Sequence, residues 1–522
     1  MSEAPTQPAP RSDQRVIVGQ TGQNVVGLLV GALATFGAQL VMSRRLGPQA
    51  FGIVVATTQF AFIAAAFTRF GMDVANVRLV SILVGRGEGG RAPGLVHRSV
   101  GIALAVSAPF AAVVFVGAPW LAERFSGLPE SATPAFRWAA VAIPVIALAF
   151  TFLGATRGLK IMVYTLIGQW VAQPVGWIVL TLGFWALVAA TAGSATAAFG
   201  ASWAVALGIG VAGWSYQRRR LPAPAGDGVP EERTGALLRF GALRAPATLF
   251  SQLLFFTDFY VISILYADDG AEGAAAVGVY GAVLRAAQAL FLFLASVSLT
   301  FSPFVADLHH RGEHEQLDRL YKQVTRWALA ATIPVLMVLI VLPEQVLRLF
   351  GRGFETGAPA LRIVALGMIV PVIVGTVGFI LIMAGRTGWD LLVYVAAFAI
   401  DVAVALTLAR PEVLGIRGAA IAQACTLTFS ALARLFLVRR FLGIWPFDGW
   451  YVRLVPPAVV GALVMLGVAA LLPATAFLPI IVLAGGAGVL AYGVGVVAFA
   501  VPPNERAAVR RIAAKVGVGR SR

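Results

Sequence analysis

About fourteen apolar runs, each close to 20 residues long, restrict this chain to one class of fold, since about 20 mostly apolar residues cross a bilayer as a helix. Backbone groups in lipid must bond within their own segment, and runs of this length favour helices over a barrel. Apolar residues make up 59% of the chain and charged residues 12%. A soluble protein has roughly 45–50% apolar residues. We therefore predict an all-α integral membrane protein.

The predicted spans cover residues 23–42, 51–72, 99–121, 138–155, 161–186, 192–215, 245–266, 275–300, 327–345, 361–384, 388–409, 417–437, 451–472 and 477–500. Lys and Arg are about threefold more frequent in the alternate segments that include both tails, as expected for cytoplasmic segments. This bias predicts a multi-pass protein of the plasma (inner) membrane with both termini cytoplasmic. It also explains much of the net charge of +16. Nucleic-acid binding would need a soluble basic domain, and none is predicted.

The second part of the chain repeats short motifs of the first part in the same order. The pairs are Phe51-Gly52 with Val277-Gly278, Arg86-Gly87-Glu88 with Arg311-Gly312-Glu313, Pro134-Ala135-Phe136-Arg137 with Pro359-Ala360-Leu361-Arg362, Val163-Tyr164 with Val393-Tyr394, and Arg218-Arg219-Arg220 with Arg439-Arg440. We predict two six-helix bundles. Because six is even, both bundles enter from the same side, so a pseudo-two-fold axis would run along the membrane normal.

The repeat and the tails give the predicted domain organisation. The domains are a cytoplasmic tail at 1–15, an N-terminal six-helix bundle at 16–215, a cytoplasmic linker at 216–244, a C-terminal six-helix bundle at 245–440, two extra C-terminal spans within 441–500, and a basic cytoplasmic tail at 501–522. The linker is rich in Pro and Gly, which suits a flexible connection.

The sequence gives no indication of catalysis. It has no Gly-x-x-x-x-Gly-Lys-Ser/Thr phosphate loop, and the Gly-x-Gly-x-x-Gly run at 208–213 lies inside an apolar span, where it favours helix packing. Gly27 and Gly31 suit close helix contact in the same way. The single cysteine, Cys425, excludes an intramolecular disulfide and a cysteine metal cluster. We predict that the protein is not an enzyme and uses no cofactor and no metal.

Ionisable residues inside spans are costly and are functional candidates by default. Asp258 and Arg285 lie in the seventh and eighth predicted spans, at similar depths below the outer surface. Their counterparts in the first half, near Ala32 and Gln59, are uncharged, so the charges break the repeat. Two interpretations stay open: a salt bridge that locks the two spans together, or a functional pair.

Other polar residues predict a cavity with more guanidinium than carboxylate. Arg44 lies at the outer end of the first span, and Arg69, Asp73 and Arg78 lie at the inner end of the second. Further hydrogen-bonding groups within spans are Gln39, Gln59, Gln169, Gln173, Gln288 and Gln423. Such a cavity suits an anionic substrate, and Arg binds phosphate oxygens in bidentate fashion.

Several segments between about 20 and 440 resemble the polysaccharide flippases of the multidrug/oligosaccharidyl-lipid/polysaccharide exporter superfamily. They are Leu46-Gly47-Pro48-Gln49-Ala50-Phe51-Gly52, Gly71-Met72-Asp73-Val74-Ala75-Asn76-Val77-Arg78, Thr257-Asp258, Tyr280 with Arg285, Ser302-Pro303, and the segment 415–422. Ser43-Arg44-Arg45-Leu46-Gly47 is similar to the first span of the lipid II flippase branch. A further Arg after that glycine is replaced here by Pro48-Gln49, which favours an oligosaccharide-linked lipid over lipid II.

The resemblance implies that Arg44, Arg78 and Arg285 line a central cavity and bind a diphosphate. We expect Asp258 to orient Arg285 or to carry a coupling proton. The predicted function is a flippase that moves polyprenyl-diphosphate-linked oligosaccharide from the inner to the outer leaflet by alternating access, for cell-surface polysaccharide synthesis. Expected partners are this lipid, membrane lipids and polysaccharide polymerase or synthase proteins, without nucleic acid. Two alternatives stay open: a cation-coupled multidrug exporter of the same superfamily, and a non-transporting membrane subunit of a polysaccharide synthesis complex.

Overall fold

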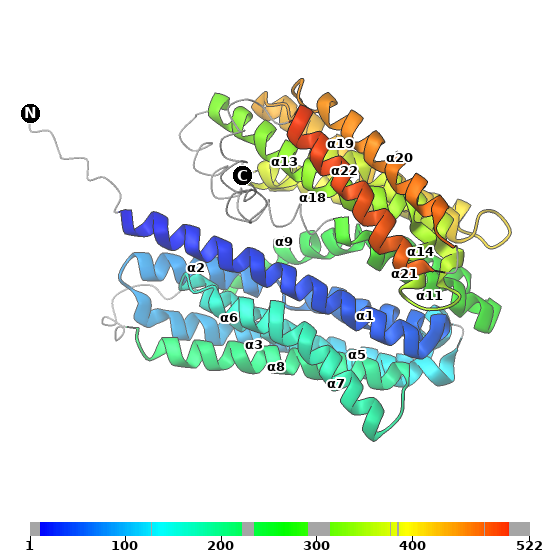
Figure 1. Ribbon diagram of the computed structural model, residues 1–522. Coiled ribbons are helices and arrows are strands. Elements are labelled where there is room, and N and C mark those ends of the chain that lie inside the picture. Colours follow the sequence, from blue (N-terminus) through cyan, green and yellow to red (C-terminus); the bar gives the residue numbers. More distant parts are fainter. Residues whose placement is uncertain are drawn as a thin grey trace, which may run out of the picture. The chain divides into compact units, whose positions relative to one another are not determined.

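The structure, a computed structural model, describes residues 11–126, 128–221, 234–290, 314–375, 377–383, 386–473 and 476–500 (Figure 1). Within these ranges it contains helices and no β-strand, which confirms the predicted all-α class. The α-helices are α1 (Arg11–Thr68), α2 (Met72–Gly85), α3 (Ala92–Val116), α4 (Ala118–Ser126), α5 (Pro129–Gly158), α6 (Val163–Thr165), α7 (Gln173–Leu187), α8 (Ala192–Arg218), α9 (Thr234–Leu253), α10 (Thr257–Leu265), α11 (Gly270–Ala287), α13 (His314–Val341), α14 (Pro343–Arg348), α15 (Ala358–Gly367), α16 (Ile369–Val374), α17 (Val377–Met383), α18 (Thr387–Leu408), α19 (Ile416–Leu442), α20 (Val455–Leu471), α21 (Phe477–Pro479) and α22 (Gly486–Gly495).

Eleven of the described helical stretches are long and apolar enough to cross a membrane, or twelve if the bent pair Leu237–Leu253 and Thr257–Leu265 is one span. The difference between twelve and fourteen has two sources. The first two predicted spans are the two arms of α1, and the eighth runs beyond residue 290, outside the described ranges. The predicted count is thus compatible with the structure.

The chain forms two compact units, Met1–Gly281 and Ala282–Arg522. The predicted domain boundaries stay a prediction. Residues 222–233 of the predicted linker lie outside the described residues, as do residues 1–10 of the N-terminal tail and the whole tail at 501–522.

In the first unit, α3, α5 and α8 lie side by side (Figure 1). Glycines bring these and neighbouring helices close together, as the sequence predicted. A Cβ on Gly210 of α8 would lie 3.2 Å from Cβ of Phe152 on α5, and one on Gly213 would lie 2.5 Å from the ring of Tyr164. Gly31 of α1 packs directly on the carbonyl oxygen of Trp170. Gly31, Gly210 and Gly213 are therefore packing residues, whereas a Cβ on Gly208 would have nothing within 4 Å.

Helix α1 is interrupted at Gly47, whose φ of 73° and ψ of 175° leave the helical region. A residue without Cβ adopts this φ without strain. Pro48 follows and has no backbone N–H to continue the hydrogen-bond ladder. The arm before the bend packs on Trp170, while the arm after it bonds α8 through a 2.9 Å contact between the hydroxyls of Thr57 and Thr196. The two arms thus have different neighbours.

Gly52 and Gly278, which the sequence repeat makes equivalent, touch each other. A Cβ on Gly52 would lie 2.9 Å from the Gly278 nitrogen, and one on Gly278 would lie 3.2 Å from the Gly52 nitrogen and would overlap the carbonyl oxygen of Pro48. Equivalent residues of two repeats meet each other when they lie on the axis that relates them. This contact supports the predicted duplication.

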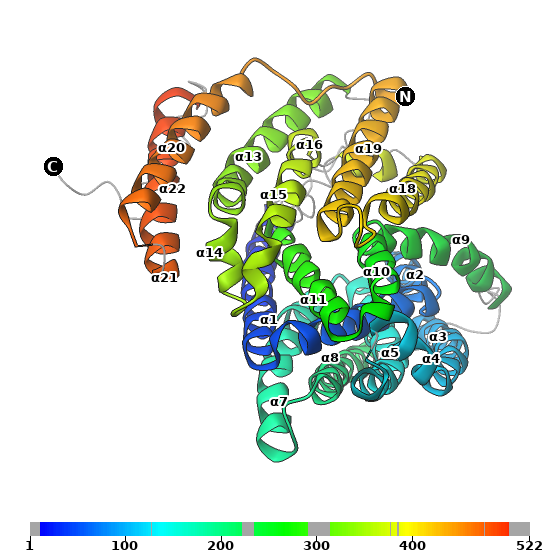
Figure 2. The same ribbon diagram turned by 90° about the vertical axis from the view of Figure 1, so that its right-hand side faces the viewer.

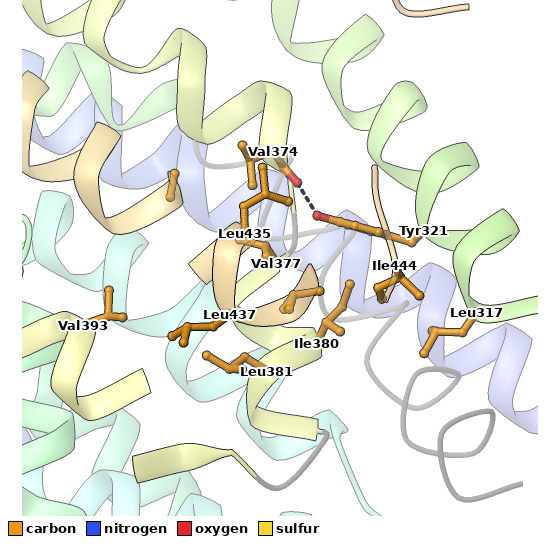
Figure 3. Packing of buried hydrophobic residues seen from close by; sticks show 12 residues of the cluster. Leu317, Tyr321, Val374, Val377, Ile380, Leu381, Val393, Leu435, Leu437 and Ile444 are labelled. Atoms are coloured by element: carbon orange, nitrogen blue, oxygen red, sulfur yellow. Dashed lines mark hydrogen bonds between the residues drawn. The ribbon is translucent and has the colours of Figure 1, made fainter. Parts of the chain in front are cut away.

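In the second unit, α18 and α19 pack as a pair and α20 packs on α22 (Figure 2). The latter two belong to the predicted extra C-terminal spans. They pack on α13, where the hydroxyl of Tyr492 donates a 2.9 Å hydrogen bond to the carbonyl of Ala330. A second apolar cluster contains Leu317, Leu435 and Val438 (Figure 3). There the hydroxyl of Tyr321 donates a 2.7 Å hydrogen bond to the carbonyl of Val374, where α16 ends.

We predict that Gly278→Ala destabilises the protein by about 3 kcal/mol, at the upper end of the usual cost of overpacking, because its Cβ meets backbone atoms that cannot rotate away. The measurement is thermal unfolding of the purified protein in detergent. Gly208→Ala is the control, since nothing lies within 4 Å of its Cβ. Equal melting temperatures for the two variants would contradict the close contact.

Candidate functional site

The break between α1 and α2 is the most unusual backbone of the first unit. Helix α1 ends at Thr68 and α2 begins at Met72, whereas the sequence predicted one span to residue 72. Phe70 and Gly71 have φ values of 53° and 68°. A bulky residue with positive φ costs free energy and persists only where its surroundings hold it. Gly241 of α9 provides that surrounding, because its missing side chain leaves room for the Phe70 ring.

This break places two charged side chains against each other. Nε of Arg69 lies 3.3 Å from Oδ1 of Asp73, and both side chains are nearly buried. The Arg69 guanidinium also lies over the ring of Phe150, with Cζ 4.5 Å from the ring centre. The sequence analysis named Arg69 and Asp73 at the inner end of the second span, and the structure pairs them.

A third charged residue, Arg157, reaches this pair because α5 lies against the backbone of α2. Gly154 and Gly158 of α5 have the small-xxx-small spacing that lets membrane helices approach closely. A Cβ on Gly154 would lie 2.5 Å from the carbonyl oxygen of Asp73, and one on Gly158 would lie 2.7 Å from that of Asn76. Asp73 and Arg69 are the charged groups that act on the Arg157 guanidinium.

A fourth charged residue, Arg244 of α9, packs its Cβ and Cγ against Gly71, two positions before Asp73. The Nε atoms of Arg157 and Arg244 are buried and make no hydrogen bond within the described residues. Arg69, Asp73, Arg157 and Arg244, which we call the arginine cluster, come from the predicted inner ends of three different spans. Three guanidinium groups and one carboxylate leave an excess of two positive charges.

Hydrogen bonds fix the backbone next to the arginine cluster. The Asn76 side-chain amide donates to the carbonyl of Thr151 at 3.0 Å, and the Ser99 hydroxyl donates to Oδ1 of Asn76 at 2.6 Å. All three side chains are buried. Helices α2, α3 and α5 are thereby joined one turn beyond Asp73, which holds that carboxylate in place.

The sequence-predicted Asp258 is completely buried near the start of α10. Its carboxylate accepts a hydrogen bond from the Tyr280 hydroxyl of α11 and one of 2.9 Å from the backbone N–H of Phe259. The nearby Tyr260 hydroxyl donates to the carbonyl of Ala56, which ties α10 to the second arm of α1. Asp258 therefore has donors on two sides.

The other sequence-predicted residues lie on three different helices. Arg285 is half-buried on α11 and donates a 3.2 Å hydrogen bond to Gln288. Arg44 and Arg78 are exposed, on α1 and α2. Their shared cavity and the pairing of Arg285 with Asp258 stay predictions.

Sequence reasoning missed Arg157 and Arg244. The signal for Arg157 was present, since it lies within Gly154-Ala155-Thr156-Arg157-Gly158 at the end of an apolar span. The role of Arg244 depends on the turn at Gly71, so no local sequence pattern indicates it. Among the described residues, no group of three His, Cys, Asp or Glu side chains has the geometry to hold a metal ion.

Two family profiles match the chain. The family described as "Polysaccharide biosynthesis protein" matches residues 20–309, more than half of the chain. The MatE family matches residues 247–407. No curated protein matches significantly.

Solved structures of the MOP superfamily share the fold. The lipid II flippase MurJ, in an inward closed conformation, has a TM-score of 0.67 and 12% identity over 90% of this chain and 97% of its own. An inward-facing multidrug resistance transporter of the MATE family has a TM-score of 0.64 and 15% identity over 80% of this chain and 98% of its own. A transporter from Pyrococcus furiosus, whose binding pocket has reversed polarity, has a TM-score of 0.59 and 15% identity over 82% of this chain and 95% of its own. At these identities the likeness shows the fold alone.

We predict that Tyr280→Phe destabilises the protein by about 1–3 kcal/mol, because a buried acceptor then loses a donor. Tyr216→Phe is the matched control, since Tyr216 is 52% exposed. Thermal unfolding in detergent compares the two. A Tyr280→Phe variant as stable as the control would mean that the Asp258 carboxylate does not depend on this hydroxyl.

Proposed function

The chain belongs to the polysaccharide biosynthesis protein family, and we propose that it is a flippase for a polyprenyl-diphosphate-linked oligosaccharide. It would carry this lipid from the inner to the outer leaflet of the plasma membrane, for cell-surface polysaccharide synthesis. The membrane-spanning all-α fold and its MOP-superfamily neighbours agree with a transporter rather than an enzyme. Cytoplasmic termini and docking to a polymerase or synthase are part of the same proposal.

The observation that carries the proposal is the net positive charge of the arginine cluster. Its guanidinium groups exceed its carboxylates by two, and two of its Nε atoms have no protein acceptor in the described residues. A diphosphate esterified at both ends carries two negative charges, so it would neutralise the excess. Arginine presents a fork of N–H donors that matches phosphate oxygens. The proposed entry point for the diphosphate is therefore the predicted inner end of the first unit.

The proposed direction of transport agrees with the membrane potential. An inside-negative potential favours the outward movement of an anion by about 2.3 kcal/mol per charge per 100 mV. Counter-ion coupling would add to or subtract from this gain. Asp258 is the proposed coupling or orienting residue, and Arg44, Arg78 and Arg285 remain proposed ligands of the diphosphate.

The second candidate is a cation-coupled multidrug exporter, which the MatE profile match favours. A cationic drug requires an available carboxylate. Four aspartates are buried among the described residues. Asp258 accepts bonds from Tyr280 and from backbone, Asp73 pairs with Arg69, and Asp390 pairs with Arg434. The fourth, Asp401 of α18, also has an interaction partner within the protein. We therefore rank this candidate second.

The deciding experiment is transport in proteoliposomes with a fluorescent polyprenyl-diphosphate sugar, with and without an inside-negative potential. We expect the lipid to move faster with the potential, and a cationic dye not to compete. Transport of the dye without transport of the lipid would favour the exporter. No transport of either by folded protein would favour the non-transporting subunit.

We predict that Arg157→Gln lowers lipid transport at least tenfold, because a hydrogen bond to a charged group contributes about 1.5–3 kcal/mol. Arg86→Gln removes an exposed charge just after α2 and should transport normally. Equal melting temperatures would show that the loss is not unfolding. Normal transport by Arg157→Gln would remove Arg157 from the site.

The same assay tests the residue that the family resemblance singled out. We predict that Arg285→Ala slows lipid transport, because an ionisable group inside a membrane span is costly and by default indicates a functional site. A normal rate would show that Arg285 instead has a structural role through Gln288.

A further inference from the structure

Three exposed arginines, Arg386, Arg439 and Arg440, gather at one end of the second unit. Helices α18 and α19 pack along each other (Figure 2) and are joined by residues 409–415, so the start of α18 and the end of α19 lie at the same end of the helix pair. The sequence predicts that this end is cytoplasmic. Within the described part of the chain, none of the three arginines makes a salt bridge.

Aromatic rings hold two of these guanidinium groups in fixed orientations. Cζ of Arg386 lies 4.7 Å from the centre of the Phe441 ring, and Cζ of Arg439 lies 4.7 Å from that of Trp445. The Phe441 ring also lies 5.8 Å from the ring of Trp389. A guanidinium that stacks by its face keeps its N–H edge free to donate. The donors are thus oriented before any ligand arrives.

The nearby carboxylates are already neutralised inside the protein. Oδ1 of Asp390 lies 2.7 Å from Nε of Arg434, and Nη1 of the same guanidinium donates to the Ser430 hydroxyl. Oδ2 of Asp318 lies 2.6 Å from Nζ of Lys322. The positive charge of the three surface arginines therefore has no counter-charge from these residues, and it favours an anionic ligand.

Apolar side chains lie directly below the arginines, toward the middle of the membrane. On α19, Leu432 and Phe436 are 49% and 67% exposed, and they share one face with Arg440 because the three positions are four residues apart. On α18, Trp389 and Leu392 are 44% and 55% exposed. A ligand that fits this surface has an anionic head and hydrocarbon tails.

We infer that the start of α18 and the end of α19 together bind an anionic phospholipid. Arg386, Arg439 and Arg440 contact its phosphate, and its acyl chains lie along Phe436 and Leu432. The first half of the repeat lacks this arrangement, because Arg220 donates to the hydroxyl of Tyr216 and stacks on the same ring. The inference concerns a lipid bound at the surface and does not depend on which substrate is transported.

Thermal unfolding of the full-length protein in neutral detergent tests the inference. We expect phosphatidylglycerol to raise the melting temperature and phosphatidylcholine or inorganic phosphate to leave it unchanged. In the double variant Arg386→Gln/Arg440→Gln, the phosphatidylglycerol concentration for half the shift should rise about thirtyfold, because each basic residue near an anionic lipid contributes about a fivefold factor.

The charge-matched control is Arg410→Gln/Arg417→Gln, which removes two exposed arginines from the opposite ends of the same helices. It should respond to phosphatidylglycerol as the unaltered protein does. If the double variant does not fold, Arg440→Gln alone replaces it in the test. Its phosphatidylglycerol concentration for half the shift should rise about fivefold. The inference is overturned if the double variant keeps its response, if the control loses as much, or if inorganic phosphate gives the same shift.

Discussion

Close backbone contact between helices at glycine is the interaction on which the rest of this structure depends. In a bilayer, helices gain little from burying apolar side chains against each other, so packing and interhelical hydrogen bonds determine which helices associate. Gly154 and Gly158 bring α5 against the backbone of α2, and Gly52 meets Gly278. The first contact assembles the arginine cluster, and the second joins equivalent parts of the sequence repeat.

Charge is the second constraint, and glycine packing decides where it is tolerated. Charged groups within spans are costly unless they pair. Asp73 is paired with Arg69, Asp390 with Arg434, and Asp258 accepts two hydrogen bonds. The carboxylates are thus used within the protein, while guanidinium groups are left over at the arginine cluster. This asymmetry is the physical basis for proposing an anionic substrate and for ranking the drug exporter second.

The fold was largely predictable because spanning length and apolar composition are local properties. The predicted spans lie mainly on helices where the structure describes them, with breaks such as those at residues 69–71 and 254–256. Gly52 and Gly278, which the repeat motifs predict to be equivalent, touch each other. The second span was predicted to end near residue 72, and the helix ends at Thr68. Phe70 adopts a left-handed conformation there, and it does so because Gly241, far away in the sequence, leaves space for its ring.

The sequence by itself determined that the chain is a helical membrane protein with an internal repeat, because hydrophobic length and motif order do not depend on tertiary contacts. It also identified Arg69 and Asp73 as charged residues at a span end. Only the tertiary structure decided that Arg157 and Arg244 join them and that Asp258 is held by Tyr280. Those contacts depend on the depth, rotation and backbone separation of neighbouring helices. Glycines, which have no side chain, determine how closely the helices approach, and the sequence of a single helix does not encode this.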